Sequence, residues 1–303
     1  MTLCTESPLG ISPITLGTMT YGNPVDFDQA VALTQYALSR GITHIDTANM
    51  YEGYNRTPGS AGGTAERIIG RALAGLDRES VRISTKLGMK VGTAPVDGGT
   101  SAEAIHTQLA RSLERLDTGY VDIYYLHCFD TGVPFAEMLE ALAEELERGR
   151  IRHYGVSNYS AGQLSGLLAE ADRLGLPRPA VCQPPLSLLK QDALQELLPL
   201  CLREQIGVIP YQIYQGGLLT GKYRRDAAAP AGSRGAEMPG WLMARDGSLF
   251  DRLEAIEREA AGCGLTMAQY ALRWTLEQPA VISAIVGVKS EAQVDSALAA
   301  LRS

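Results

Sequence analysis

The sequence predicts an α/β protein of the (β/α)8 TIM-barrel class, a single domain over residues 1–303 with an extra helix before the eighth strand. Short apolar runs rich in β-branched residues alternate with helix-patterned segments, and eight such pairs fill the chain. This alternation implies a parallel sheet, and eight pairs are the number in a closed barrel. An open doubly wound sheet is the rival fold, but residues 17–22 after the first strand lack its glycine fingerprint.

The first four strand–helix pairs follow from periodicity and from signals at helix ends. Strands are predicted at 14–17, 43–46, 81–86 and 121–127, and helices at about 28–40, 64–74, 101–116 and 135–148. Gly41 closes the first helix as a C′ glycine, and Thr64 and Ser101 are the expected N-caps of the next two.

The last four pairs are separated by longer loops. Strands are predicted at 151–156, 180–183, 206–210 and 280–286, and helices from about 160, at 192–204 with Asp192 as N-cap, at 249–262 and at 290–301. The extra helix is expected at 266–277. The stretch 224–240, rich in Ala, Gly and Pro, is expected to be a mobile loop over the barrel mouth.

Composition and charge argue against several classes of protein. A net charge of −7 disfavours binding to nucleic acid or to an anionic membrane surface, and no apolar run approaches the roughly 20 residues of a membrane span. The first residues also lack the features of a signal peptide. We therefore expect a cytoplasmic protein, a monomer by default with a homo-oligomer left open. Five scattered cysteines without a CxxC pair, and only four histidines, predict free thiols and no metal site.

Four chemically complementary polar residues follow three successive predicted strands. Asp46, Lys86 and His127 end the second, third and fourth strands, and Tyr51 comes five positions after Asp46. Singly, each has an ordinary interpretation as a turn cap, a solvated charge or a packing residue. In a barrel of parallel strands, however, these strand ends meet at one mouth.

The four side chains together predict acid–base chemistry. An ammonium near a phenol lowers the pKa of the phenol, so Lys86, oriented by Asp46, would make Tyr51 a general acid. His127 would orient a carbonyl oxygen. Protonation of an alkoxide suits hydride transfer, and the hydride must come from a cofactor because no side chain supplies one.

Further segments follow in order along nearly the whole chain: GITHIDTA at 41–48 with Tyr51, STK at 84–86, YLH at 125–127, GVSN at 155–158, Gln183, QGGLLTGKY at 215–223, and GVKS at 287–290 with Gln293. With these segments the sequence resembles the aldo-keto reductase family, in its bacterial and potassium-channel β-subunit branch. The resemblance implies a (β/α)8 barrel that binds NADPH without a Rossmann domain and reduces an aldehyde or ketone.

The resemblance also implies roles for individual residues. The catalytic set would be Asp46, Tyr51, Lys86 and His127, and no metal is implied. The residues that would line the cofactor fall into three groups: Thr18, Met19, Ser157, Asn158, Gln183, Tyr211 and Gln212 around the nicotinamide; Gly217, Leu218 and Lys222 along the pyrophosphate; and Arg234, Gly287, Lys289, Ser290 and Gln293 around the 2′-phosphate and adenosine.

Several positions depart from the family pattern. Gln212 replaces a small serine, Ser296-Ala297 replaces a Glu-Asn pair near the adenine, and Lys289 stands where arginine is frequent. Lysine is a point charge rather than a planar fork, so NADPH stays favoured over NADH by a smaller margin. An insertion at 54–63 is expected to shape the substrate pocket together with five residues: Met19, Tyr21, Tyr54, Phe129 and Trp241. For Phe129 and Trp241, plain packing in the loops is an equal alternative.

Other functions stay open at this point. The same residues serve oxidation of a sugar or alcohol, and a regulatory module that binds cofactor would need the fold without turnover. A TIM-barrel hydrolase would want paired carboxylates at strand ends, where only Asp46 and Asp130 are present. The small-molecule carbonyl remains unidentified.

Overall fold

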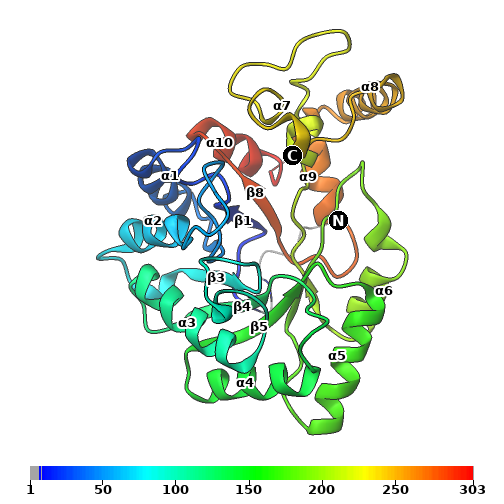
Figure 1. Cartoon of the computed structure of the whole chain (residues 1–303). Coiled ribbons are helices and arrows are strands. Elements are labelled where there is room, and N and C mark those ends of the chain that lie inside the picture. Colours follow the sequence, from blue (N-terminus) through cyan, green and yellow to red (C-terminus); the bar gives the residue numbers. More distant parts are fainter. Residues whose placement is uncertain (1–6, 8, 303) are drawn as a thin grey trace.

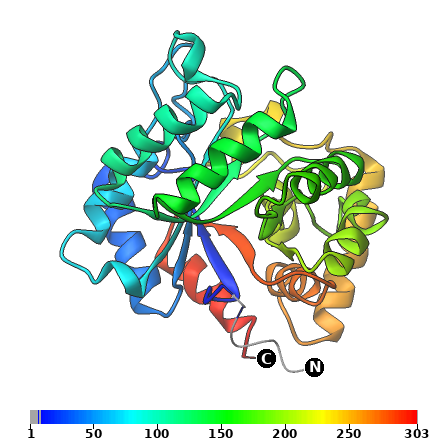
Figure 2. The same cartoon turned by 90° about the horizontal axis from the view of Figure 1, so that it is seen from below.

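The computed structural model describes residue 7 and residues 9–302. Within these residues, eight parallel strands form one curled sheet, and helices pack around its outside (Figure 1, Figure 2). This architecture is α/β and consistent with a (β/α)8 fold.

The strands follow one another around the sheet in chain order, with β1 also paired to β8. Their bounds are β1 Ile14–Gly17, β2 His44–Asp46, β3 Arg82–Leu87, β4 Val121–Leu126, β5 Ile151–Ser157, β6 Val181–Gln183, β7 Gly207–Val208 and β8 Ala284–Gly287. Val208 also bridges to Val281, and Ile282 donates its backbone N–H to the carbonyl oxygen of Val208 at 2.9 Å. Hydrogen bonds therefore join β7 to the segment that leads into β8.

Alternate residues of the strands face two different environments. Ile14, Leu16, Ile45 and Ile83 belong to the large core cluster packed between the strands and the helices. Because strand side chains alternate between faces, the residues between them point to the interior of the curled sheet. On β1, β2 and β3 these interior positions hold five polar side chains: Thr15, His44, Asp46, Ser84 and Lys86.

The helices connect successive strands. Their bounds are α1 Phe27–Ser39, α2 Thr64–Leu73, α3 Ala102–Leu116, α4 Phe135–Glu147, α5 Ala161–Leu174, α6 Leu197–Arg203, α7 Arg234–Glu237, α8 Gly247–Gly262, α9 Met267–Leu276 and α10 Glu291–Ala299. Ser101 caps α3 by accepting from the backbone N–H of Ala104, as predicted. Gly41, directly after the C-cap of α1, has a φ of 90°, which suits a C′ glycine.

Two local predictions were wrong. The N-cap of α2 is Gly63 in the left-handed region (φ 81°), and Thr64 is already helical. A Cβ at Gly63 would lie 2.2 Å from Cδ of Arg115, so a side chain does not fit there. Asp192 does not cap a long helix either: it begins a short 3-10 turn, and α6 starts only at Leu197 because Glu196 leaves the helical region.

Candidate active site

Asp46 and Lys86 form a buried ion pair at the ends of β2 and β3. Lys86 Nζ lies 2.5 Å from Asp46 Oδ1 and donates a second hydrogen bond to the carbonyl oxygen of Thr47 at 2.7 Å. Lys86 is fully buried, and Asp46 is 2% exposed. Burial lowers the pKa of Lys86, and the neighbouring carboxylate of Asp46 opposes that shift.

The second oxygen of Asp46 is held by two further donors. Ser84 Oγ and Gln183 Nε2 each donate to Asp46 Oδ2 at 2.9 Å. Ser84 is the register partner of Asp46 across β2 and β3, whereas Gln183 comes from the end of β6. Side chains from β2, β3 and β6 thus fix one carboxylate inside the curled sheet.

Tyr51 lies over this ion pair in a loop that is hydrogen-bonded on both sides. Its backbone N–H donates to Ala48, and its carbonyl oxygen accepts from Ala65 at the start of α2. Lys86 Nζ is 5.1 Å from the centroid of the Tyr51 ring. The loop between β2 and α2 therefore brings the phenol to the ammonium, as the sequence predicted.

The predicted direction of the pKa shift of Tyr51 was wrong. Burial, followed by the negative charge of Asp46, raises the pKa of Tyr51 well above its usual value. The positive charge of Lys86 does not reverse this, because the ammonium is bound to Asp46 and Thr47. At neutral pH the Tyr51 hydroxyl is protonated.

His127 follows β4 and faces Tyr51. Its ring centroid is 5.9 Å from that of Tyr51, with the rings nearly perpendicular. Burial lowers the pKa of His127 to about 3, with the charges of Lys86 and Arg56 adding to the effect. The ring is therefore neutral, and its Nδ1 is buried without a hydrogen-bond partner in the described part of the chain.

Four of the residues expected around the nicotinamide lie together next to His127. Asn158 is exposed, adopts a left-handed backbone (φ 61°), and donates from Nδ2 to the carbonyl oxygen of His127 at 2.9 Å. Its Oδ1 accepts from the hydroxyl of Tyr211 at 2.6 Å. Ser157 Oγ donates to the carbonyl oxygen of Gln183 at 2.9 Å. The Gln183 side chain, by contrast, is already bound to Asp46.

The remaining residues expected near the nicotinamide lie on two loops. Thr18 follows β1, is fully buried, and donates from Oγ1 to the carbonyl oxygen of Asp46 at 3.0 Å. Met19 is partly exposed beside it. Gln212 is exposed and left-handed (φ 58°) in the loop after β7. The structure thus ties Thr18 to the catalytic strand end.

The segment expected along the pyrophosphate forms a tight turn, the 3-10 segment η4 (Gln215–Thr220). Gly217 is left-handed (φ 96°), and a Cβ there would lie 2.6 Å from Nζ of Lys222. Leu218 is buried in a second core cluster under α8 and α9. Glycine at 217 therefore lets the Lys222 ammonium approach the backbone of the turn.

The charges expected at the 2′-phosphate lie beside an acid that the sequence did not indicate. Lys289 Nζ is 3.0 Å from Glu237 Oε2 and donates to the carbonyl oxygen of Gly232 at 3.0 Å. Burial lowers the pKa of Lys222, and among the neighbouring charges those of Lys289 and Arg234 act in the same direction. These three cations, which we call the basic cluster, lie close enough to repel one another.

The first turn of α10 belongs to the same region. Gln293 Oε1 accepts from the backbone N–H of Lys289 at 2.7 Å. Ser290 is the exposed N-cap of α10 and makes no side-chain cap hydrogen bond, and Gly287 is exposed at the end of β8. The three residues follow one another where β8 leads into α10.

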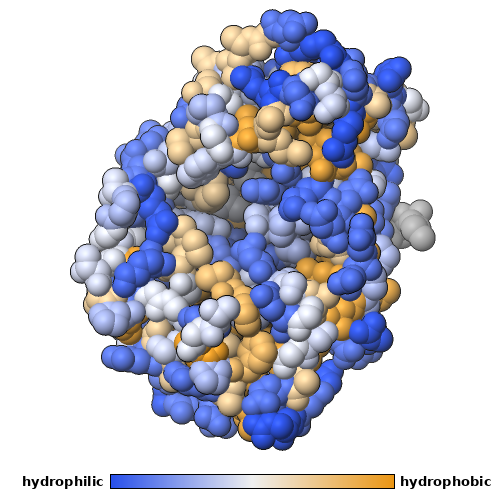
Figure 3. All heavy atoms as spheres, turned by 45° about the vertical axis from the view of Figure 1, so that its right-hand side comes forward, coloured by the Kyte–Doolittle hydropathy of each residue, from blue (hydrophilic) through white to orange (hydrophobic). Residues whose placement is uncertain are grey.

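The residues expected to shape the substrate pocket divide into two groups. Tyr54 contacts Trp241 with ring centroids 5.6 Å apart, and Arg234 lies 6.0 Å from the Tyr54 ring. The insertion beside Tyr51 therefore touches the long loop after β7, and the surface is hollowed below the segment that carries α7 and α8 (Figure 3). Tyr21 was assigned wrongly, because it is fully buried with its hydroxyl on Thr34.

Phe129 packs between two aromatic neighbours. Its ring centroid is 5.8 Å from that of Phe135 and 5.5 Å from that of Tyr159. Both neighbours belong to the main core or pack against it. These contacts favour the packing alternative for Phe129.

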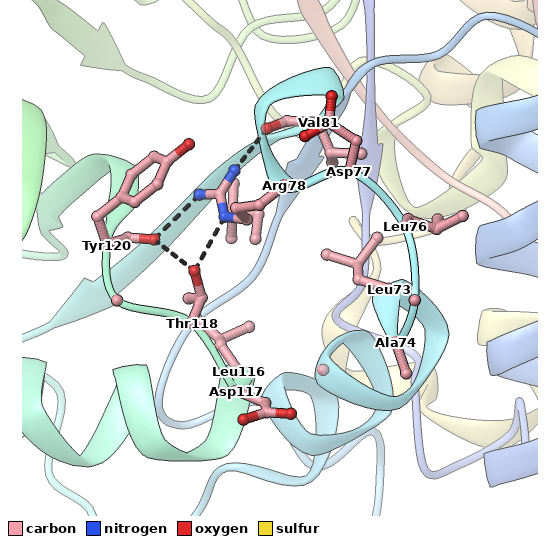
Figure 4. A pocket seen from close by; sticks show the side chains of 14 residues that line it. Leu73, Ala74, Leu76, Asp77, Arg78, Val81, Leu116, Asp117, Thr118 and Tyr120 are labelled. Carbon is pink, nitrogen blue, oxygen red and sulfur yellow. Dashed lines mark hydrogen bonds between the residues drawn. The ribbon is translucent and has the colours of Figure 1, made fainter.

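A cavity of about 330 Å³ lies away from all of these residues. It is lined by the end of α2, the start of β3 and the end of α3, at the opposite ends of the strands (Figure 4). Arg78 crosses it and donates to Thr118, to the carbonyl oxygens of Val81 and Tyr120, and to Asp122. Its donors are engaged in holding the surrounding loops, which makes the cavity a structural feature.

The sequence did not indicate three polar residues that lie beside the candidate active site or the basic cluster: Ser84, His44 and Glu237. Ser84 and His44 precede Lys86 and Asp46 by two positions, so alternation along the strands could have indicated that they point the same way. Glu237 gave no comparable signal, because it meets Lys289 from the end of α7, 52 residues earlier in the chain.

Comparisons with known proteins identify the class. The Aldo/keto reductase family model matches residues 13–303. A probable voltage-gated potassium channel subunit beta of Arabidopsis thaliana is 32% identical over 98% of this chain and 89% of its own length. The NADH-specific methylglyoxal reductase of Escherichia coli K12 is 33% identical over 97% of this chain and 92% of its own length. The L-glyceraldehyde 3-phosphate reductase of the same strain is 30% identical over 98% and 86%.

The chain therefore belongs to the aldo-keto reductase family, as its segments indicated. It is an oxidoreductase of a family that uses a nicotinamide cofactor. Among the described residues there is no cluster of three or more potential metal ligands, and none of their helices is long and apolar enough to cross a membrane. Four cysteines are free thiols, and Cys4 lies outside the described residues.

Proposed function

We propose that the chain is a single-domain, closed (β/α)8 barrel that reduces a small aldehyde or ketone to an alcohol with NADPH. The observation that carries this proposal is the placement of the Tyr51 phenol beside the Lys86–Asp46 ion pair and the His127 ring. A carbonyl placed between Tyr51 and His127 would meet two neutral hydrogen-bond donors. We propose these four residues as the catalytic set.

The proton transfer is assigned to Tyr51. A bound nicotinamide supplies the hydride to the carbonyl carbon. Tyr51 then gives its proton to the oxygen, which carries the developing negative charge. The ammonium of Lys86, 5.1 Å from the centroid of the ring, stabilises the phenolate that remains. The raised pKa of Tyr51 keeps the proton available until this charge develops.

His127 is assigned the orientation of the carbonyl. A neutral imidazole carries one N–H, and Nδ1 is buried without a partner in the described residues. With a pKa of about 3, His127 stays neutral in the working range and does not compete with Tyr51 as a proton source. It would donate a hydrogen bond that fixes the direction of the substrate oxygen.

The residues around this mouth fit an extended, anionic cofactor. Asn158 and Tyr211 present amide and phenol groups to an exposed face, which suits a carboxamide and an aromatic ring. The mutual repulsion within the basic cluster of Lys222, Arg234 and Lys289 would be relieved by phosphate. Gly217 lets the Lys222 ammonium lie close to the turn, where a phosphate would meet it. The other residues expected from the sequence complete the proposed cofactor site.

The preference for NADPH over NADH rests on the basic cluster. Lys289 would bind the 2′-phosphate, but it is ion-paired with Glu237. One similar chain is named as an NADH-specific reductase, so a preference for NADH occurs among similar chains. We propose NADPH with a preference that Glu237 reduces, because a 2′-phosphate must displace this carboxylate from Lys289.

A regulatory role is the second candidate, favoured by the similarity to a protein named as a potassium channel subunit. The experiment that separates the two measures NADPH and NADH oxidation with a panel of aldehydes, ketones and keto-sugars, and NADP⁺ reduction with polyols in parallel. Turnover of a carbonyl supports the reductase. Tight cofactor binding without turnover of any carbonyl or alcohol would contradict it and leave the regulatory role.

A further inference from the structure

A row of hydrogen-bonded polar side chains crosses the interior of the curled sheet below Asp46. Its members are Ser283, Thr15, His44 and Ser84, and all four are fully buried. The interior of such barrels is ordinarily filled by Val, Ile and Leu. Burying polar groups instead costs free energy unless each one is hydrogen-bonded. We therefore ask what function would favour polar side chains over apolar ones at this depth.

The row is continuous and ends on the carboxylate of Asp46. Ser283 Oγ is 2.7 Å from Thr15 Oγ1, which is 2.8 Å from His44 Nδ1. His44 Nε2 is 3.1 Å from Ser84 Oγ, and Ser84 Oγ is 2.9 Å from Asp46 Oδ2. Strand register supports the arrangement, because Thr15 pairs with His44 and Asp46 pairs with Ser84.

The inventory of protons fixes the direction of these hydrogen bonds. The carboxylate of Asp46 accepts from Lys86 at Oδ1 and from the hydroxyl of Ser84 at Oδ2, so the proton of Ser84 points to Asp46. The oxygen of Ser84 then accepts from Nε2–H of His44. Burial lowers the pKa of His44 to about 4, so the ring is neutral with one N–H, and its Nδ1 accepts from Thr15. Every donor in the row points toward Asp46.

We propose that His44 is a positioning residue for the reaction: held as the Nε2–H tautomer by Thr15, it orients Ser84 and thereby fixes the carboxylate of Asp46. Ser84 and Gln183 then occupy Oδ2 and leave Oδ1 for Lys86, which keeps the ammonium beneath the Tyr51 ring. His44 itself touches neither substrate nor cofactor. This inference rests on the proposed function of Tyr51 and Lys86.

A purely structural polar layer would behave differently from a positioning one. Its disruption would lower the stability of the fold and leave the turnover of the folded fraction unchanged. Loss of positioning would lower kcat with little change in the KM for cofactor, because the cofactor residues on the later strands and loops are not part of the row.

The experiment compares Ser84→Ala and Thr15→Val with Thr34→Val. Thr34→Val is the matched control, because Thr34 is also fully buried and its hydroxyl is 2.9 Å from that of Tyr21, outside the row. We expect Ser84→Ala to lower kcat by about tenfold or more, as loss of a hydrogen bond to a charged group would. Thr15→Val should lower kcat by about threefold, and Thr34→Val should leave it unchanged at a comparable loss of stability.

The second readout is the tautomer of His44, measured by ¹⁵N NMR of the imidazole in the substrate-free protein. We expect Nε2–H in the wild type and in Ser84→Ala, and a mixture of tautomers in Thr15→Val, where the donor to Nδ1 is gone. A wild-type ring protonated at Nδ1 would overturn the proposal. So would Ser84→Ala with wild-type kcat.

These outcomes separate this proposal from the proposed function. A wild-type protein that reduces no carbonyl would overturn the proposed function and this inference with it. A wild type that does turn over, together with Ser84→Ala at full kcat, would overturn the positioning role alone. Thermal unfolding of each variant identifies a loss of kcat that comes from misfolding.

Discussion

The proposed catalytic residues and the basic cluster are built in opposite ways. Asp46 and Lys86 are buried on neighbouring strands, and each of their polar atoms is bound by a fixed partner. Lys222 and Lys289 lie outside the helices and strands, Arg234 begins the short helix α7, and Lys289 is paired with Glu237 at the end of α7. The proposed proton transfer would thus start from groups already held by the sheet, whereas the proposed phosphate binding would require Lys289 to give up its contact with Glu237.

The largest expected difference between the two regions comes from removing one lysine in each. Lys86→Met should lower the free energy of unfolding by about 3–5 kcal/mol, because it leaves Asp46 buried without its counter-charge. It should also lower kcat by about a hundredfold or more. Lys222→Met, the same chemical change at an exposed position, should alter stability by about 0.5 kcal/mol or less and raise the KM for NADPH. Urea unfolding and steady-state kinetics measure both. Equal losses of stability in Lys86→Met and Lys222→Met would contradict the difference that we draw between the two regions.

The next effect concerns cofactor choice. Glu237→Gln removes the charge that pairs with Lys289, so we expect the KM for NADPH to fall by about three- to tenfold. The KM for NADH should change little, since it carries no 2′-phosphate. Glu204→Gln, which also removes an ion-paired carboxylate but at the C-cap of α6 before β7, is the control. An equal fall in the KM values for NADPH and NADH would mean that Glu237 affects binding of both cofactors and not binding of the 2′-phosphate.

A third prediction concerns pH and the buried histidines near the catalytic end. Burial lowers the pKa of His44 to about 4 and that of His127 to about 3, from 6.5. Below pH 6.5 the unfolded chain therefore binds protons that the folded chain does not, and stability falls as pH falls from 6.5 toward 4. Each histidine contributes a slope of up to about 1.4 kcal/mol per pH unit. Urea unfolding at pH 7, 6 and 5 should show this slope, and His127→Asn should reduce it. If the pH dependence of stability in His127→Asn equals that of the wild type, the lowered pKa of His127 is wrong.

The smallest expected effect concerns the contact between the two loops. Trp241→Ala removes the ring packed on Tyr54, so cofactor should dissociate about two- to tenfold faster. The dissociation rate of Trp241→Ala is measured by stopped-flow fluorescence of the bound NADPH. In a separate measurement, Trp274→Phe leaves Trp241 as the single tryptophan of the chain and reports whether Trp241 responds to cofactor. If the fluorescence of Trp241 does not change when cofactor binds, the contact between Trp241 and Tyr54 lies away from the cofactor site.

The two regions also differ in how far the sequence could predict them. Asp46, Lys86 and His127 stand at the ends of short apolar runs rich in β-branched residues, so their shared location followed from parallel strand ends. The shift of the Tyr51 pKa did not follow, because burial and the binding of the Lys86 ammonium to Asp46 depend on packing. Local sequence gave no indication of Glu237 beside Lys289, since loops far apart in the chain bring them together.

The N-caps of α3 and α2 also differ in how far the local sequence could predict them. Ser101 caps α3 through its own side chain, which a local pattern reveals. At the N-cap of α2, Gly63 has a left-handed backbone (φ 81°), and the Arg115 side chain from α3 lies where a Cβ would be. A tertiary contact thus replaced the hydroxyl cap expected at Thr64.

The central claim is that Tyr51 gives the proton from a site assembled before substrate binds. The most direct test measures cofactor affinity and carbonyl turnover of Tyr51→Phe beside the wild type. For Tyr51→Phe we expect unchanged NADPH affinity and a fall in kcat of about 10²–10⁴-fold, the range for loss of a general acid. Tyr51→Phe that binds NADPH normally and turns over at the wild-type rate would contradict it.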